Sequence, residues 1–460
     1  MKNSRLVPVL VTSSLLGCFS FAAAAELSSW PEWRGTSGAG ISPGATPPTT
    51  WSDQQNIRWK TKVGGLGFST PIIWKDRVYL LTAIETSEDR APAPAPAPVP
   101  SAPAAGGDQK GKGGKKGGFG GGGKPTKVHE WAVMALDRKT GAIVWQKTAR
   151  REVPHEGRHA TNSFASASPL TDGEHLYASF GSRGLYCYDL QGNLKWEKDL
   201  GDMQTRNGFG EGSSPALAGN LLIVPWDQEG GGSFIVALDK KTGAEVWRQA
   251  RDERTSWSTP LIVTVGGKQQ AILPATKRTR SYDVATGELI WEASGLGANV
   301  IPVPVTGHGM VYVTSGFQGF FIQAIKLTAR GDVSAGPDMV WQQRKGTPYV
   351  ASPVLSGDRI FVSKGTESYL SCLNALTGEF HYTDQPLEGM RGGIYASPVA
   401  ANGLLYVVGR EGLVLVLKDT TTFEVVAKNQ LNDRIDASPV MVDKELFLRG
   451  HEHLYCIAEG

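Results

Sequence analysis

Short apolar runs bounded by turn-forming residues recur along most of this chain. Residues 221–225 and 233–239 are two such runs, and both are dominated by aliphatic side chains. Runs of this length between clusters of Gly, Pro, Asn and Asp are typical of β-strands. The pattern of apolar and polar positions therefore predicts an all-β protein built from many short strands.

One phrase repeats within this pattern: Asp or Asn, then Thr-Gly, then an aromatic residue four positions after the glycine. It occupies residues 137–145, 239–247, 283–291 and 374–382, with a version one residue shorter at 189–196. The Asp or Asn side chain accepts hydrogen bonds from backbone amides just ahead of it, and glycine adopts positive φ without steric cost, so the phrase predicts a tight turn between strands. Unrelated surface hairpins would not share one offset, so we interpret the phrase as a repeated structural unit.

The tryptophan of the phrase is large enough to fill the gap between neighbouring sheets. The structural residues assigned to the repeat are Asp137, Gly141, Trp145, Trp196, Gly243, Trp247, Gly287 and Trp291.

A second marker, Ser-Pro or Thr-Pro followed by apolar residues, opens the first strand of each unit. Proline suits that position because its missing N–H costs little there. The marker begins at Thr70, Ser168, Ser214, Thr259, Ser352, Ser397 and Ser438, and Val303-Pro304 fills the gap in the series. Eight starts at a period of roughly 45 residues, each followed by short strands, predict an eight-bladed β-propeller of four-stranded blades.

The two ends of the chain predict how the ring closes. The sequence after Pro439 offers one strand too few for a blade, whereas residues 56–61 carry Trp59 before the first marker. We therefore expect the N-terminal strand to complete the last blade, which removes exposed sheet edges. Three units are degenerate: the fifth reaches Trp341 through an insertion, the sixth has Tyr382, and the seventh lacks the glycine and the tryptophan.

The residues before the propeller divide into two segments. A basic start, a largely apolar stretch and small residues at 22–25 predict a signal peptide over residues 1–25, too short for a membrane span. The alternative is lipidation of Cys18, because residues 15–18 resemble a bacterial lipobox. Residues 26–55 are an N-terminal extension and residues 56–460 the propeller. We expect an exported protein that is periplasmic, secreted or associated with the outer membrane.

Residues 86–128 are predicted to form a disordered loop inserted in the first blade, because Pro-Ala repeats pass there into Gly- and Lys-rich chain. Most of the basic surplus behind the formal charge of +3 lies in this loop and in the leader. The folded body is therefore slightly acidic, and no nucleic-acid partner is predicted. The loop is either a tolerated insertion or a tether to an anionic envelope polymer.

Three cysteines follow the leader, at Cys187, Cys372 and Cys456. They fall in the third strands of three different units, and the first two hold the position of Ala135 and Ala237 in other units. Such an odd and sparse set is not a disulfide framework. We predict three small buried core residues and no disulfide among them.

Blade topology gathers the candidate binding residues on one face of the disc. The Thr-Gly turns mark the other face, whereas the segments before each marker and the turns before each third strand lie here. Arginine presents a planar fork suited to oxyanions, so these residues predict an anionic ligand; pairing with neighbouring acids is the alternative. The candidate ligand-binding residues are Arg158, His159, Arg206, Arg254, Arg278, Arg391, Arg434, His451 and His453.

No catalytic or metal site is predicted. His451 and His453 share one face of a strand as a metal pair would, but no third ligand is visible, so we interpret them as turn residues. The sequence contains no Gly-x-Ser-x-Gly, His-Glu-x-x-His or Walker motif. Asp227 and Glu229 are acid–base candidates that nothing distinguishes from solvated carboxylates.

The repeat resembles the PQQ-like β-propeller family, which includes quinoprotein dehydrogenases and BamB-like exported propellers. The resemblance is carried by Ala-x-Asp-x-x-Thr-Gly-x-x-x-Trp at 135–145 and 237–247 together with the Ser-Pro strand starts, and it covers nearly everything after Asn56. Residues 30–35 and 56–60 are similar to exported PQQ-like proteins of uncharacterised role, common in planctomycete-type bacteria. The motif is specific for the fold and weak for activity.

The resemblance implies several functions. Quinoprotein dehydrogenases carry PQQ with Ca²⁺ and a vicinal disulfide, but no two cysteines here are adjacent and a set of calcium carboxylates cannot be placed. We therefore expect a non-catalytic scaffold or ligand-binding propeller without a cofactor, in a BamB-like envelope role. Its partner would be an anionic small molecule or an envelope protein. The alternatives are a PQQ-dependent oxidoreductase and an envelope polymer-binding protein.

Overall fold

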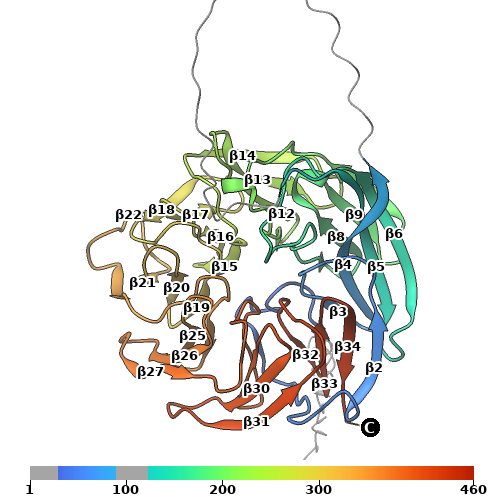
Figure 1. Ribbon diagram of the computed structural model, residues 1–460. Helices are drawn as coiled ribbons and strands as arrows, with labels where there is room; N and C mark the ends of the chain where they lie inside the picture. Colours follow the sequence, from blue (N-terminus) through green and yellow to red (C-terminus); the bar gives the residue numbers. More distant parts are fainter. Residues whose placement is uncertain (1–28, 90–122, 460) are drawn as a thin grey trace, which may run out of the picture.

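The computed structural model describes residues 29–89 and 123–459 and arranges them as a ring of eight β-sheets around a central axis (Figure 1). Each sheet is one blade of four antiparallel strands, so the predicted eight-bladed β-propeller is confirmed. The predicted signal peptide with Cys18, and residues 90–122 of the predicted loop, lie outside the described residues. In the described part of the chain, no helix has the length and apolar character needed to cross a membrane.

The first four blades follow the chain order of their strands. They are β3 (Ile72–Trp74), β4 (Arg77–Asp89), β5 (Lys127–Asp137) and β6 (Ile143–Glu152) in blade 1; β7 (Leu170–Thr171), β8 (His175–Ser179), β9 (Leu185–Asp189) and β10 (Leu194–Lys198) in blade 2; β11 (Ala216–Ala218), β12 (Leu221–Trp226), β13 (Ser233–Asp239) and β14 (Glu245–Arg251) in blade 3; and β15 (Leu261–Val265), β16 (Lys268–Leu273), β17 (Thr279–Asp283) and β18 (Leu289–Ala293) in blade 4.

The other four blades continue the ring. They are β19 (Val305–Gly307), β20 (Met310–Ser315), β21 (Phe321–Lys326) and β23 (Met339–Gln343) in blade 5; β24 (Val354–Ser356), β25 (Arg359–Ser363), β26 (Tyr369–Asn374) and β27 (Phe380–Pro386) in blade 6; β28 (Val399–Ala401), β29 (Leu404–Val408), β30 (Leu413–Lys418) and β31 (Val425–Gln430) in blade 7; and β32 (Val440–Val442), β33 (Glu445–Arg449), β34 (His453–Ile457) and β2 (Ile57–Lys62) in blade 8. Two short 3-10 helices, η1 (Gly181–Arg183) and η2 (Arg206–Gly208), lie in connections.

Two short strands join existing blades by parallel pairing. β1 (Ile41–Ser42) pairs with β28, and β22 (Gly331–Asp332) pairs with β18. The second strands carry near-continuous burial, as in β12 and β29, because both of their faces pack against neighbouring blades. The fourth strands alternate buried and exposed positions, as in β14, because only one face is covered.

The ring closes as the sequence predicts. β2 pairs antiparallel with β34, with Trp59 opposite Cys456. Figure 1 shows the blue β2 beside the red β34 at the outer edge of the last blade. Closure is reinforced by Arg138 of blade 1, which forms ion pairs with Asp443 and Glu445 of blade 8 at 2.7 and 2.6 Å.

The repeated phrase forms the contact between successive blades. The Asp137 carboxylate accepts hydrogen bonds from the amides of Lys139 and Thr140, and Gly141 adopts a φ of +73°. A Cβ on Gly141 would lie 2.5 Å from the Trp59 ring of the preceding blade, whose indole N–H donates to the Arg138 carbonyl at 2.8 Å. The same glycine–tryptophan contact recurs at Gly192 with Trp145, Gly243 with Trp196, Gly287 with Trp247, and Gly378 with Trp341.

Trp291 departs from this pattern because the fifth unit has no Thr-Gly turn. The insertion between β21 and β23 replaces the turn, and its Ala329 and Val333 pack against Trp291 instead. The Trp291 indole N–H has no acceptor among residues 29–89 and 123–459. In the degenerate fifth unit, an apolar contact with the insertion therefore replaces the glycine–tryptophan contact seen between other blades.

A second ring of hydrogen bonds surrounds the axis and is made by the hydroxyls of the Ser-Pro and Thr-Pro markers. Seven of the eight marker residues, all except Thr259, donate a backbone N–H to the hydroxyl of the next blade's marker at 2.9–3.2 Å. The donor and acceptor pairs are Thr70 to Ser168, Ser168 to Ser214, Ser214 to Thr259, Val303 to Ser352, Ser352 to Ser397, Ser397 to Ser438, and Ser438 to Thr70. The ring is interrupted after Thr259 because Val303 has no hydroxyl.

The N-terminal extension crosses the axis and ties several blades together. Trp30 exchanges two backbone hydrogen bonds with Ile73 of blade 1, at 2.7 and 2.9 Å. Arg34 is fully buried and donates to the carbonyls of Pro353 and Pro398, each at 2.7 Å. The described part of this segment therefore packs on the propeller from the axis, at Arg34, to the outer strand of blade 7, where Asn429 accepts the Trp51 amide at 2.8 Å.

Two further predictions meet the structure. The edges of the predicted loop are wrong, because β4 and β5 continue as a paired hairpin with Glu85 opposite His129 and Asp89 opposite Lys127. Alternating polar residues there were compatible with either a strand or a loop. The cysteine prediction is confirmed: Cys187, Cys372 and Cys456 are buried and free.

Glu32 of the extension faces a chamber of about 70 Å³ against the inner strands of blades 2–4. Its carboxylate forms no hydrogen bond or ion pair with the described residues, and burial raises the pKa of Glu32 to about 7. The folded protein therefore holds a proton at Glu32 that the unfolded chain releases near its ordinary pKa of 4.5.

We predict that Gly243→Ala destabilises the protein more than Gly403→Ala. Both glycines have a positive φ, +70° and +72°, so each alanine costs about 1–2 kcal/mol in backbone strain. The Cβ at 243 would also lie 2.7 Å from the Trp196 ring, whereas nothing lies within 4 Å at 403. The contact adds about 1–3 kcal/mol, measured as the free energy of unfolding in urea. Equal losses in the two variants would contradict the packing role of the phrase.

We also predict that Glu32→Gln removes part of the pH dependence of stability. The raised pKa stabilises the wild type fully below about pH 4.5, and this contribution, up to about 3 kcal/mol, is lost as the pH rises through 7. Glutamine mimics the protonated carboxyl, so the variant should gain stability relative to the wild type between pH 4.5 and 8. Urea midpoints measured across this range test it, and parallel curves for the two proteins would rule it out.

Candidate functional site

A cavity of about 630 Å³ opens around the axis on the face opposite the Thr-Gly turns. Its walls come from the segments that lead into the inner strands of all eight blades, together with the turns at Phe317 and Thr366. Its base is formed by Trp33 of the N-terminal extension and by marker hydroxyls. These hydroxyls belong to the ring of hydrogen bonds around the axis, which we call the axial ring. The volume is in the range of sites for small molecules.

Aromatic side chains make up much of the cavity wall. Phe317 and Tyr349 stack with their ring centroids 5.2 Å apart, and Phe209 lies 6.5 Å from Trp257. The Trp257 indole N–H donates to the Gly210 carbonyl at 2.7 Å, which fixes the orientation of that ring. The wall therefore presents flat apolar surfaces whose positions are set before any ligand arrives.

Arg206 is the cation of this wall. It lies at the start of η2, where its backbone N–H donates to Thr255 Oγ1 at 2.9 Å, and its Nη1 donates to Asn299 Oδ1 at 3.0 Å. Asn299 is buried and in turn donates from Nδ2 to the Tyr349 hydroxyl at 3.4 Å. No carboxylate of the described chain pairs with Arg206, and its Nε and Nη2 donors have no acceptor there. The guanidinium is held along one edge and remains available along the other.

His159 also lines the cavity. Its Nδ1 accepts the Thr161 amide at 3.2 Å, and its ring stands edge-on to Phe209 with the centroids 5.1 Å apart. Nδ1 also lies 2.8 Å from the Thr161 hydroxyl, whereas Nε2 has no partner among the described residues. His159 thus adds a polar ring nitrogen without a partner beside the aromatic wall.

Asp436 is the only carboxylate in the lining that the described residues provide, and its oxygens contact Arg410 and His451. Arg410 donates from Nε and Nη2, and His451 Nε2 lies 2.8 Å from Asp436 Oδ2. Burial opposes ionisation, but the hydrogen bonds from His451 and Arg410 hold the pKa of Asp436 below its ordinary value. His451 stacks on Phe68 at 4.9 Å, so this predicted residue lies beside the cavity and supports its wall.

The remaining arginines on the connecting segments fall into two groups. Arg254, Arg391 and Arg434 are exposed on the segments that carry Trp257, Tyr395 and Asp436, and none forms a hydrogen bond or ion pair through its side chain with the described residues. Arg158 lies behind the wall, where it donates to the Asn162 carbonyl at 2.6 Å and packs over Phe164. Burial lowers the pKa of Arg158.

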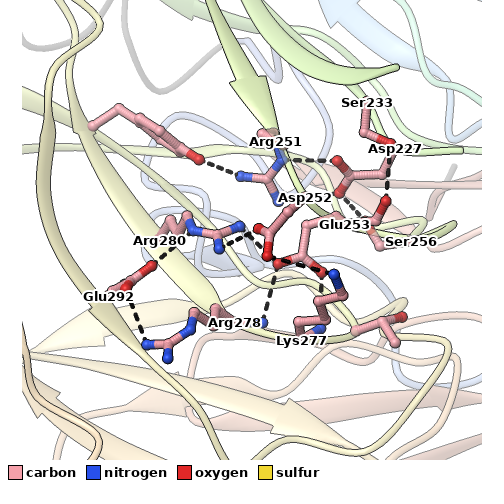
Figure 2. A network of polar contacts seen from close by, with 12 residues as sticks. Asp227, Ser233, Arg251, Asp252, Glu253, Ser256, Lys277, Arg278, Arg280 and Glu292 are labelled. Carbon is pink, nitrogen blue, oxygen red and sulfur yellow. Dashed lines mark hydrogen bonds and ion pairs between the residues drawn. The ribbon is translucent and has the colours of Figure 1, made fainter. Parts of the chain in front are cut away.

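Arg278 lies outside the cavity in a polar network between blades 3 and 4 (Figure 2). It pairs with Glu292 at 3.0 Å and Asp332 at 2.8 Å, so here the pairing alternative holds. His453 also faces an acid, with its Nδ1 3.5 Å from Asp433 Oδ2. No group of three or more His, Cys, Asp or Glu suited to a metal ion occurs among the residues that the structure describes.

Asp227 belongs to the same network and is paired there, so it is no longer a candidate for acid–base chemistry. Its carboxylate accepts Arg251 Nε at 2.7 Å and Ser256 Oγ at 2.6 Å, and the Arg251 and Asp227 side chains are buried (Figure 2). Glu229 accepts a hydrogen bond from the Thr255 hydroxyl at 3.1 Å. Both carboxylates hold neighbouring segments in place, as buried polar groups generally do.

Sequence reasoning missed the aromatic wall and the contribution of the extension. A signal existed, because the residue two positions before each marker lines the cavity in every blade. These residues are Phe68, Ser166, Gly212, Trp257, Ile301, Val350, Tyr395 and Asp436. Trp33 gave no comparable signal, since it belongs to no repeat.

The family described as outer membrane protein assembly factor BamB matches residues 129–384, more than half of the chain. BamB of Burkholderia pseudomallei (strain K96243) is 26% identical over 238 residues, which are 50% of this chain and 55% of that protein. BamB of Francisella salina is 29% identical over 130 residues, 26% of this chain and 23% of that protein. The chain thus spans about half the length of the Burkholderia protein and about a quarter of the Francisella protein.

Solved structures share the fold at low identity. The crystal structure of BamB from Moraxella catarrhalis superimposes with a TM-score of 0.52 and 16% identity, covering 70% of this chain and 91% of that one. Quinohemoprotein alcohol dehydrogenase from Comamonas testosteroni gives a TM-score of 0.59 and 9% identity, covering 95% and 82%. These similarities establish the architecture and leave the activity open. With the matched family and the eight repeated blades, the chain belongs to the PQQ-like β-propeller family represented by the assembly factor BamB.

Proposed function

We propose that this chain is an exported, non-catalytic propeller of the cell envelope, similar in role to BamB, and that its central cavity binds an anionic ligand or partner group. The family match supports the envelope role. The observation that carries the binding role is Arg206, whose guanidinium has free donors beside a rigid aromatic wall and no neutralising carboxylate. An unneutralised arginine in a concave apolar site favours an oxyanion.

The exposed arginines support the same sign of charge. Arg254, Arg391 and Arg434 lie on segments that form the cavity wall, and none is paired through its side chain with a described residue. Unpaired cations around an opening raise the local concentration of anions and their rate of arrival. Because Arg410 neutralises Asp436, the lining keeps the positive charge of Arg206.

The alternative of a PQQ-dependent oxidoreductase receives less support from the residues present. A calcium ion takes six to eight oxygen ligands, usually including several carboxylates, and Asp436 is already paired with Arg410. The three described cysteines lie in blades 2, 6 and 8, where no two can cover a quinone as a vicinal disulfide. The lining therefore does not fit PQQ with Ca²⁺.

That alternative is tested by titrating the purified protein with PQQ in the presence and absence of Ca²⁺. We expect no calcium-dependent quinone absorption band and no dye-linked oxidation of alcohols. A saturable band that requires Ca²⁺ would reinstate the enzyme and overturn the non-catalytic assignment.

We predict that Arg206→Gln weakens the binding of 2-naphthoate, a planar aromatic carboxylate used as a probe, by about tenfold or more. A hydrogen bond to a charged group is worth about 1.5–3 kcal/mol, and glutamine removes the charge while keeping a polar side chain. Isothermal titration calorimetry measures the affinity, with neutral 2-naphthamide as the matched ligand.

Two controls make this prediction specific. Arg278→Gln removes an arginine that pairs with acids outside the cavity, so 2-naphthoate affinity should stay unchanged. The affinity for 2-naphthamide should be the same in the wild type and in Arg206→Gln. If both arginine variants bind 2-naphthoate as the wild type does, the cavity is not the anion site.

A further inference from the structure

All seven hydroxyls of the axial ring accept backbone amides, none has an acceptor for its own hydrogen among the described residues, and five of them line the central cavity. Thr70, Ser168, Ser214, Ser397 and Ser438 each accept one N–H, and none donates to any residue that the structure describes. These residues are only 2–6% exposed. A buried donor without an acceptor costs about 1–3 kcal/mol, and the five hydroxyls that line the cavity can donate to a group bound there.

These five hydroxyls share one place in the molecule. They belong to blades 7, 8, 1, 2 and 3, which are consecutive around the ring, and all five line the base of the central cavity. We name them the hydroxyl arc. Thr259 and Ser352 make the same amide contacts in blades 4 and 6 but do not line this cavity. The arc is therefore a set of donors gathered at one end of the cavity.

The hydrogen bonds of the ring increase the donor strength of the arc. Each hydroxyl oxygen already receives an N–H, and a hydroxyl that accepts one hydrogen bond becomes a better donor for another. With an amide on the oxygen, the remaining O–H is the group that a ligand in the cavity would meet. A ring of such donors suits an oxygen that carries negative charge.

The charged groups around the arc are few. Arg34 lies beside it, because its guanidinium binds the carbonyls of Pro353 and Pro398, which directly follow Ser352 and Ser397. Asp436 is paired with Arg410 and His451. Glu32 lines the separate chamber described above, and Ser168 and Ser214 line both that chamber and the central cavity. Among the described residues, Glu32 is the one unpaired carboxyl near the arc. Apart from Glu32, the surroundings favour an anion.

We propose that the hydroxyl arc is an oxyanion site, which binds a carboxylate or phosphate group at the deep end of the cavity. This inference rests on the proposed binding function and adds to it. The oxyanion of the ligand lies at the end of the cavity near Trp33. Arg206 on the wall holds a second polar group of the ligand where one is present. An aromatic or apolar portion then lies against Phe209, Trp257, Phe317 and Tyr349.

The test compares alanine variants of marker serines that play the same structural role. Ser397→Ala and Ser438→Ala remove hydroxyls of the arc, whereas Ser352→Ala removes a hydroxyl that accepts an equivalent amide outside the cavity. All three variants should lose similar stability in urea. We expect the affinity for inorganic phosphate, or for acetate, to fall about five- to tenfold in the two arc variants and to stay unchanged in Ser352→Ala.

The outcomes separate this inference from the proposed function. Equal affinities in all variants, equal losses in all three, or no binding of phosphate and acetate to the wild type would overturn the arc. Dependence of 2-naphthoate binding on Arg206 could still hold in each case. The converse result is phosphate binding that depends on the arc together with a 2-naphthoate affinity that Arg206→Gln leaves unchanged. That result would overturn only the assignment of Arg206 as an anion-binding residue.

A second measurement needs no variant. Crystals of the wild-type protein soaked in selenate should show an anomalous peak within hydrogen-bond distance of the arc hydroxyls. Phosphate and acetate serve as the two competing arms, and whichever displaces selenate at the lower concentration identifies the preferred oxyanion. Selenate only at surface lysines or arginines would overturn the proposal.

Discussion

Each blade depends on the contact with its neighbour, because a four-stranded sheet of this size cannot bury both of its faces alone. That contact is made twice, at two radii. Near the outside, the tryptophan of one blade covers the turn glycine of the next and donates to a carbonyl of that turn. At the axis, backbone amides bond to the marker hydroxyls of the following blade. Closure between β2 and β34 leaves no blade at an end. The tryptophan contact is replaced at Trp291, and the hydroxyl series is interrupted between Thr259 and Val303.

The same construction produces the cavity. Because every inner strand starts at a marker held to the ring, the residue two positions earlier is delivered to the same radius in each blade. Repetition fixes where these side chains lie and leaves their identity free, as Trp257, Tyr395 and Asp436 illustrate. The extension then closes the base with Trp33, anchored by the buried hydrogen bonds of Arg34. The repeat supplies the frame, and the residues that do not repeat supply the chemistry.

The fold could be predicted from the sequence because its determinants are local and periodic. Thr-Gly turns, marker prolines and the stray Trp59 each report a backbone position, and the eight blades follow. The candidate site could be predicted only in part. Arg206 and His159 line the cavity, whereas Arg278 lies in a network with Glu292 and Asp332. Which acid an arginine reaches depends on neighbouring blades, and periodicity contains no information on such contacts.

The marker hydroxyl has a role both in the fold and in the proposed binding site. As an acceptor it holds one blade to the next, and this role is the same in blades 6, 7 and 8. As a donor it has meaning only where the cavity reaches it, which is true of Ser397 and Ser438 and not of Ser352. A hydroxyl that seven of the eight blades use for architecture thus acquires a binding role in five of them. The cavity, with Trp33 of the extension in its lining, reaches these hydroxyls and not those of Thr259 and Ser352.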